Sequence, residues 1–83
     1  MSDYSFVDFH AEAMYTAKCM GKEKDLIHAA MGLCSESGEF MDAIKANFAY
    51  NKPLDTENLI EELGDIMWFT ALACNALQIP MDL

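Results

Sequence analysis

The sequence predicts an all-α fold, a helical bundle with about three helices in each chain. Apolar residues recur at three- and four-residue spacing along three segments, which is the pattern of helices with one buried face. No segment shows the strict alternation of a half-buried strand. Hydrophobic residues make up 53% of the 83 residues, which suits one small globular domain, spanning residues 1–83, and excludes a disordered chain.

The first predicted helix covers residues 6–18. Ser5 can accept a hydrogen bond at its N-terminus, and Asp8 places a negative charge in the first turn. Gly21 suits a position that ends this helix. The apolar stripe at helical spacing consists of Phe6, Phe9, His10, Ala13, Met14 and Ala17.

The second predicted helix covers residues 24–48. Its apolar stripe predicts the face that packs against the rest of the bundle. The stripe consists of Ile27, Ala30, Cys34, Met41, Ile44 and Phe48.

The third predicted helix begins after a turn at residues 50–54, is capped by Asp55 or Thr56, and reaches Leu77. Between residues 66 and 77 only Thr70 and Asn75 are polar. A helix that is apolar all round must be covered on all sides, and two further helices from so short a chain do not suffice. The segment is also too short to span a bilayer. We therefore expect self-association, as a homodimer or a dimer of dimers.

Charge and cysteine content limit the classes of partner and compartment. The net charge is −9, the five basic residues are all lysines, and arginine is absent, which argues against a nucleic acid polymer as partner. A phosphorylated small molecule would require a bound cation to reverse the local field. The three cysteines are an odd number without C-x-x-C spacing and predict buried reduced thiols. No signal peptide is visible, so a cytoplasmic location is expected.

Two pairs of carboxylates carry the chemical signal. Glu36 and Glu39 lie three residues apart on the second helix, and Glu62 and Asp65 lie three apart on the third. Residues at this spacing share one helical face. If the two helices form a hairpin, four carboxylates can converge, and oxygen ligands of this kind suit Mg²⁺ or Mn²⁺. The alternative is an acidic face exposed to solvent, which a chain with 14 acidic residues readily contains.

Further features bear on a ligand at these carboxylates. Each pair encloses a glycine, Gly38 or Gly64, and an interior helical glycine indicates close approach of another group. His28 lies two turns before Glu36, and Phe69 follows one turn after the second pair, so these two side chains are candidates for contact with a substrate. The alternative for His28 is a packed or surface position without a ligand, and the alternative for Phe69 is packing in the core. A di-iron bundle would require E-x-x-H, which the chain lacks.

Two runs of residues resemble the MazG-like all-α nucleoside triphosphate pyrophosphohydrolases. They are AAMGLCSESGE at residues 29–39 and LIEELGDIMWF at residues 59–69. The family signature is E-x-x-E followed by E-x-x-D on the next long helix. Glu36, Glu39, Glu62 and Asp65 match it position by position, and the resemblance covers roughly residues 9–83.

The resemblance implies a fold, a reaction and an assembly. The fold is a helical bundle completed by dimerisation. The reaction is Mg²⁺-dependent hydrolysis of a (deoxy)nucleoside triphosphate to the monophosphate and pyrophosphate, in cleaning of the nucleotide pool. Carried over by motif, Glu36, Glu39, Glu62 and Asp65 become metal ligands. One of the three glutamates would also orient and deprotonate the attacking water, which makes them the candidate catalytic residues.

The chain departs from the family pattern at two places. Many relatives continue into a further helix with basic residues that reach the substrate, whereas this sequence stops at Leu83. Relatives often carry an arginine near the end of the first helix, where this chain has Tyr15. These differences leave a second hypothesis open, a catalytically weak helical module that binds nucleotides or a protein partner.

Overall fold

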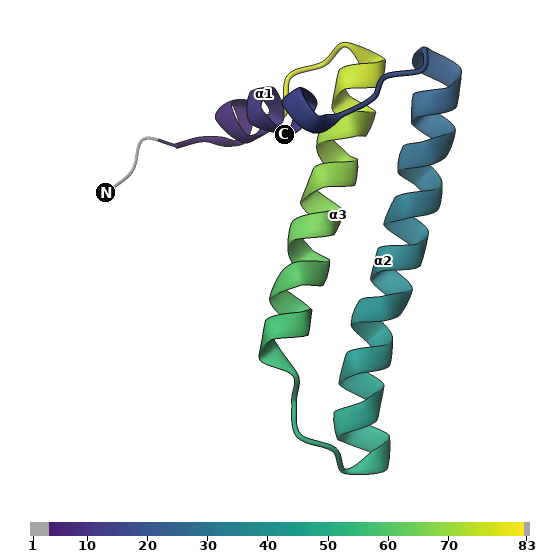
Figure 1. The fold of residues 1–83 in the computed structure, drawn as a ribbon, viewed down its shortest axis with the longest axis vertical. Helices are drawn as coiled ribbons and strands as arrows, with labels where there is room; N and C mark the ends of the chain where they lie inside the picture. The colour runs from purple at the N-terminus through teal and green to yellow at the C-terminus, as the bar shows by residue number, and fades with distance from the viewer. Residues whose placement is uncertain (1–3, 83) are drawn as a thin grey trace.

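The computed structural model describes residues 4–82 and contains three helices (Figure 1). They are α1 (Phe6–Thr16), α2 (Lys22–Tyr50) and α3 (Thr56–Leu77). The described residues include no strand, so the predicted all-α class is confirmed. Helix α1 ends two residues earlier than predicted, and α2 extends two residues further at each end.

Capping groups define the ends of the helices. The Ser5 hydroxyl accepts from the Asp8 backbone N–H at 3.2 Å, and the Asp8 carboxylate accepts from the Ser5 N–H at 3.0 Å, which is a capping box for α1. Asp55 caps α3 by accepting from the Asn58 N–H at 3.2 Å. Gly21 was predicted to end α1, but α1 ends at Thr16 and Gly21 directly precedes α2. Its φ of 105° favours glycine.

Helices α2 and α3 form a long antiparallel hairpin, and the short α1 lies across α3 near its C-terminal end (Figure 1). The apolar core lies where α1 meets α3. Its buried members are Ala13, Ala71, Cys74 and Met81, with Phe9, Met14, Met67 and Trp68 packed around them. The Trp68 indole N–H also donates to the Thr16 hydroxyl at 3.2 Å, which links α1 to α3.

The apolar stripe predicted for α2 does not face the bundle. Ile27 is 60% exposed, Met41 61% and Phe48 90%, because α2 packs on α3 through the opposite face. That face carries Asp25, Ala29 and Gly32, which are buried. Asp25 is accommodated there because its carboxylate accepts from the Met20 N–H at 2.9 Å.

Two further expectations need correction. Much of the apolar segment at residues 66–77 is covered within the chain, because α1 and Met81 pack on it, and Leu72 is only 2% exposed. This segment therefore does not by itself require a partner chain. The three cysteines are free, as expected, but only Cys74 is buried.

No helix within residues 4–82 is long and apolar enough to cross a bilayer.

Candidate metal and nucleotide site

The antiparallel hairpin brings the two acidic motifs together at mid-length. Glu36 lies on the face of α2 that contacts α3, one turn after the buried Gly32, and Glu62 lies on the facing side of α3. One carboxylate oxygen each from Glu36, Glu62 and Asp65 lie within 4.8 Å of one another. Three of the four predicted ligands therefore converge. Glu39 is not part of this group, although it lies close enough to Glu62 to affect its ionisation.

Burial leaves two of these oxygens without partners. Glu62 is 7% exposed, and Glu36 is half-buried. The Oε2 atoms of both residues are inaccessible to solvent and, with both carboxyl groups ionised, have no hydrogen-bond partner. No described lysine or histidine forms a salt bridge with them. Buried carboxylate oxygens without a donor are costly, so this pair requires a proton or a cation between its members.

The pKa of Glu62 is raised to about 8. The largest cause is a hydrogen bond between its protonated form and the Glu36 carboxylate, and burial of the side chain follows. A hydrogen bond with Glu39 and the negative charges of both neighbours raise the pKa further. Without metal, the site therefore holds a proton at neutral pH, at the place where the unpartnered oxygens meet.

The donor set fits a hard divalent cation. The converging group offers carboxylate oxygens and neither nitrogen nor sulfur, which is the ligand chemistry of Mg²⁺ and Mn²⁺. Glu36, Glu62 and Asp65 would hold such an ion, because one oxygen from each lies within 4.8 Å of the other two.

An aromatic cluster lies one turn from the carboxylates, on the side nearer α1. The rings of His28 and Phe69 meet edge to face with centroids 5.5 Å apart. Trp68 joins them at 6.4 Å from His28 and 5.3 Å from Phe69. Trp68 therefore contacts both this cluster and the apolar core between α1 and α3. His28 is exposed and Phe69 half-buried, so the cluster offers an aromatic surface beside the acidic group.

A different glycine from those predicted makes the close contact. A Cβ at Gly32 would overlap the Phe69 ring, so glycine allows the ring to lie directly on the α2 backbone. A Cβ at Gly38 or Gly64 would meet nothing within 4 Å in this chain. The expectation of close approach at those two positions is therefore not met within the described chain.

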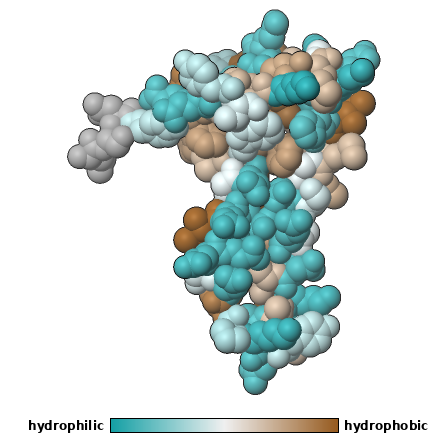
Figure 2. All heavy atoms as spheres, in the orientation of Figure 1, coloured by the Kyte–Doolittle hydropathy of each residue, from teal (hydrophilic) through white to brown (hydrophobic). Residues whose placement is uncertain are grey.

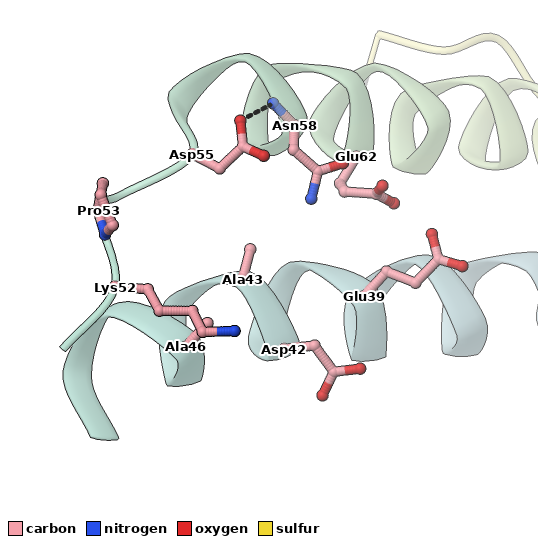
Figure 3. Close-up of a pocket in the computed structure, with 9 residues that line it drawn as sticks. All are labelled: Glu39, Asp42, Ala43, Ala46, Lys52, Pro53, Asp55, Asn58 and Glu62. Carbon is pink, nitrogen blue, oxygen red and sulfur yellow. Dashed lines mark hydrogen bonds between the residues drawn. The ribbon is translucent and has the colours of Figure 1, made fainter. Parts of the chain in front are cut away.

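A pocket of about 540 Å³ extends from the carboxylates toward the loop between α2 and α3 (Figure 3). Figure 3 shows the Glu39 and Glu62 carboxylates directed toward one another across the gap between the helices. Sequence reasoning gave no role to Lys52 or Asn58, which lie in this pocket. The full lining consists of Glu39, Asp42, Ala43, Ala46, Lys52, Pro53, Asp55, Asn58 and Glu62. The sequence signal that could have indicated this pocket is a lysine in the turn between two helices that carry acidic residues.

Comparison with known proteins identifies the family. The family model of the MazG nucleotide pyrophosphohydrolase domain matches residues 26–82, well over half of the chain. The chain therefore belongs to the MazG nucleotide pyrophosphohydrolase domain family. The match includes both acidic motifs, the aromatic cluster and the loop that carries Lys52. Searches of curated proteins and of solved structures returned no match.

Proposed function

We propose that the protein hydrolyses (deoxy)nucleoside triphosphates to the monophosphate and pyrophosphate, with Mg²⁺ or Mn²⁺ as cofactor, and serves in cleaning of the nucleotide pool. One observation carries this proposal. Carboxylates of Glu36, Glu62 and Asp65 converge in this chain, and two of their oxygens are buried without a hydrogen-bond donor. The chain belongs to a family of nucleotide pyrophosphohydrolases. A chain of net charge −9 that binds a triphosphate requires a cation at such a place.

The four motif carboxylates divide into two roles. Glu36, Glu62 and Asp65 would hold the cation, since their oxygens form the compact group. Bound Mg²⁺ supplies neutralisation of phosphate charge and a more acidic water. Glu39 lies beside this group but outside it, and so can accept the proton of the attacking water. The water oxygen then bonds to the α-phosphorus, and the bond to the bridging oxygen breaks with its electrons leaving on pyrophosphate.

The aromatic cluster supports a site for the nucleobase. His28 and Phe69 lie one to two turns from the acidic group on the hairpin, at a distance suited to a nucleoside whose α-phosphate is at the metal. Base stacking on an aromatic side chain contributes about 1–3 kcal/mol and tolerates any base. We therefore propose both residues as contacts to the base, with Trp68 supporting the Phe69 ring at 5.3 Å.

Self-association completes the proposal, and exposed apolar side chains support it. The outer side of α2 exposes Met31 by 67%, Met41 by 61% and Phe48 by 90%. The outer side of α3 exposes Ile60 by 63% and Leu63 by 50%. Figure 2 shows hydrophobic atoms at the edges of the hairpin and a hydrophilic surface between them. Large exposed apolar patches mark association sites, and two opposite faces suit a homodimer or homotetramer.

A nucleotide screen tests the reaction. The purified protein is incubated with each common nucleoside and deoxynucleoside triphosphate, with Mg²⁺ or with EDTA, and pyrophosphate and orthophosphate are measured separately. We expect pyrophosphate with Mg²⁺ and no turnover in EDTA. Asp65→Asn should suppress turnover, whereas Glu61→Gln, the same loss of charge at an exposed position outside the converging group, should not.

Two results of this screen, and one result of a separate nucleotide-binding measurement, would contradict the proposal. Release of orthophosphate would show attack at the terminal phosphorus. Turnover in EDTA would remove the role of the cation. Magnesium-dependent nucleotide binding without turnover would support the second hypothesis, a helical nucleotide-binding module.

A further inference from the structure

The pocket beyond the carboxylates has two chemically different ends. At one end Glu39 and Glu62 face each other, and Glu62 is more than nine-tenths buried with an Oε2 atom that lacks a partner. At the other end lie Lys52 and Pro53, in the loop between α2 and α3 (Figure 3). The pocket therefore joins the metal-binding group to a single basic residue, and nothing in the proposed reaction yet uses that residue.

Two hydrogen bonds hold the backbone of Lys52 in place. Its N–H donates to the Ala46 carbonyl at 3.1 Å, and its carbonyl accepts from the Asn47 side-chain amide at 2.8 Å. Asn51, which precedes it, adopts the left-handed conformation that ends α2, with a φ of 59°. The lysine is thus presented from a fixed point on the loop, and Figure 3 shows its side chain extended along α2 into the pocket.

The amino group of Lys52 is available for a ligand. It is the one basic group among the residues that line the pocket, and it forms no salt bridge with any described residue, although Asp42 and Asp55 line the same pocket. A lysine ammonium suits phosphate oxygens, since it carries three donors on a flexible stem.

The two sides of the acidic group match the two ends of a nucleoside triphosphate. The aromatic rings of His28 and Phe69 lie on the side nearer α1, and the polar pocket with Lys52 lies on the opposite side. Ala46, which anchors Lys52, is about two turns beyond Glu39, roughly 10 Å along the helix. The terminal phosphates and an extended lysine side chain can bridge this distance together.

We propose that this pocket binds the β- and γ-phosphates of the substrate, the part released as pyrophosphate, and that Lys52 contacts the terminal phosphate. The inference rests on the proposed function for the identity of the substrate. It fixes the direction of the nucleotide along the hairpin, with the base toward α1 and the leaving group toward the loop.

The charge of the pocket sets the form in which pyrophosphate binds. Four acidic residues line it against the one lysine, so free pyrophosphate is repelled and its magnesium complex is accepted. The four are Glu39, Asp42, Asp55 and Glu62. The subsite therefore requires both the cation and Lys52, and the two contributions can be measured separately.

Calorimetric binding of magnesium pyrophosphate tests the subsite without any need for turnover. Lys52→Ala should weaken binding about tenfold or more, because it removes a charged hydrogen-bond donor. The main-chain hydrogen bonds of the loop remain in this variant, and circular dichroism checks the fold. Lys52→Arg should retain most of the affinity. Lys45→Ala is the matched control, since Lys45 lies on α2 outside the pocket, with its amino group 6.0 Å from the Tyr50 ring centre.

Binding of a nucleoside monophosphate with Mg²⁺ provides the second measurement, and Lys52→Ala should leave it unchanged. Equal pyrophosphate affinity in the Lys52→Ala and Lys45→Ala variants would overturn the subsite, as would an equal loss of monophosphate affinity. If the wild type releases pyrophosphate while Lys52→Ala binds it normally, the subsite fails and the proposed function stands. If the wild type hydrolyses no nucleotide but binds pyrophosphate through Lys52, the proposed function fails and the subsite stands.

Discussion

Replacing Glu62 by glutamine should remove a pH-dependent loss of stability from the metal-free protein. The pKa of Glu62 is raised from 4.5 to about 8, first by its hydrogen bond with Glu36 and then by burial. The folded state therefore binds a proton that the unfolded state has already released. Between pH 4.5 and about pH 8 the free energy of unfolding falls as the pH rises. Unfolding releases a proton in this range, and a lower proton concentration favours that release. Glutamine is neutral throughout and lacks this dependence.

The size of the effect follows from the two pKa values. At pH 7 a group with a pKa of about 8 is mostly protonated in the folded protein, whereas the unfolded chain is almost fully ionised there. The melting temperature of Glu62→Gln minus that of the wild type should change little below pH 4.5. It should increase steadily in favour of the variant up to about pH 8 and stay level above it.

Thermal unfolding in EDTA between pH 4 and pH 9 measures this difference. Glu61→Gln is the control, because Glu61 is exposed and outside the converging group. The same raised pKa predicts that binding of Mg²⁺ to the wild type at pH 7 releases a proton, measured by calorimetry in two buffers of different ionisation enthalpy. A melting-temperature difference that stays constant across this pH range would refute the assignment of the raised pKa to Glu62.

Three further outcomes are expected. Gly32→Ala should lower stability relative to Gly38→Ala by about 1–3 kcal/mol in thermal unfolding, because only the first added methyl overlaps the Phe69 ring; equal stabilities would contradict that packing. Glu39→Gln should abolish turnover while keeping Mg²⁺ affinity within about threefold of wild type by calorimetry, and a parallel loss of affinity would make Glu39 a ligand. Met41→Glu should shift light-scattering mass toward the monomer, since it places a charge on the exposed apolar side of α2; an unchanged mass would exclude this surface.

Local sequence signals predicted the helices and the position of the acidic group. Helical periodicity, the Ser5 and Asp55 caps and the turn before α3 located all three helices to within two residues at each end. The spacing of the two carboxylate pairs predicted that four carboxylates can converge in a helical hairpin, because residues three apart share a face. Three of the four, Glu36, Glu62 and Asp65, form the compact group, and Glu39 lies outside it. These features depend on residues that are close together in the chain, so local sequence patterns are enough to predict them.

The faces on which the helices pack could not be predicted in the same way. The apolar stripe of α2 was expected to face the bundle, but Ile27 and Met41 are exposed and the buried contact to α3 uses Asp25 and Gly32. Periodicity identifies an apolar face without showing whether the same chain or another covers it. The role of Lys52 was missed for a related reason, since a loop residue acquires its neighbours only when the hairpin closes.

The orientation of α2 explains how a chain of this composition can build a charged site at all. In a self-sufficient hairpin, apolar residues fill the space between the helices and acids lie outside. Here the half of the hairpin nearer the α2–α3 loop reverses this order, with Glu36 and Glu62 between the helices and Phe48 and Ile60 on the outside. Repulsion between the inner carboxylates opposes closure of the hairpin, while a proton or cation between them favours it. Burial of the outer faces by a second copy would favour the same closed state. Metal binding, proton release and self-association should therefore be thermodynamically linked through the α2–α3 contact, because each acts on the same two helices.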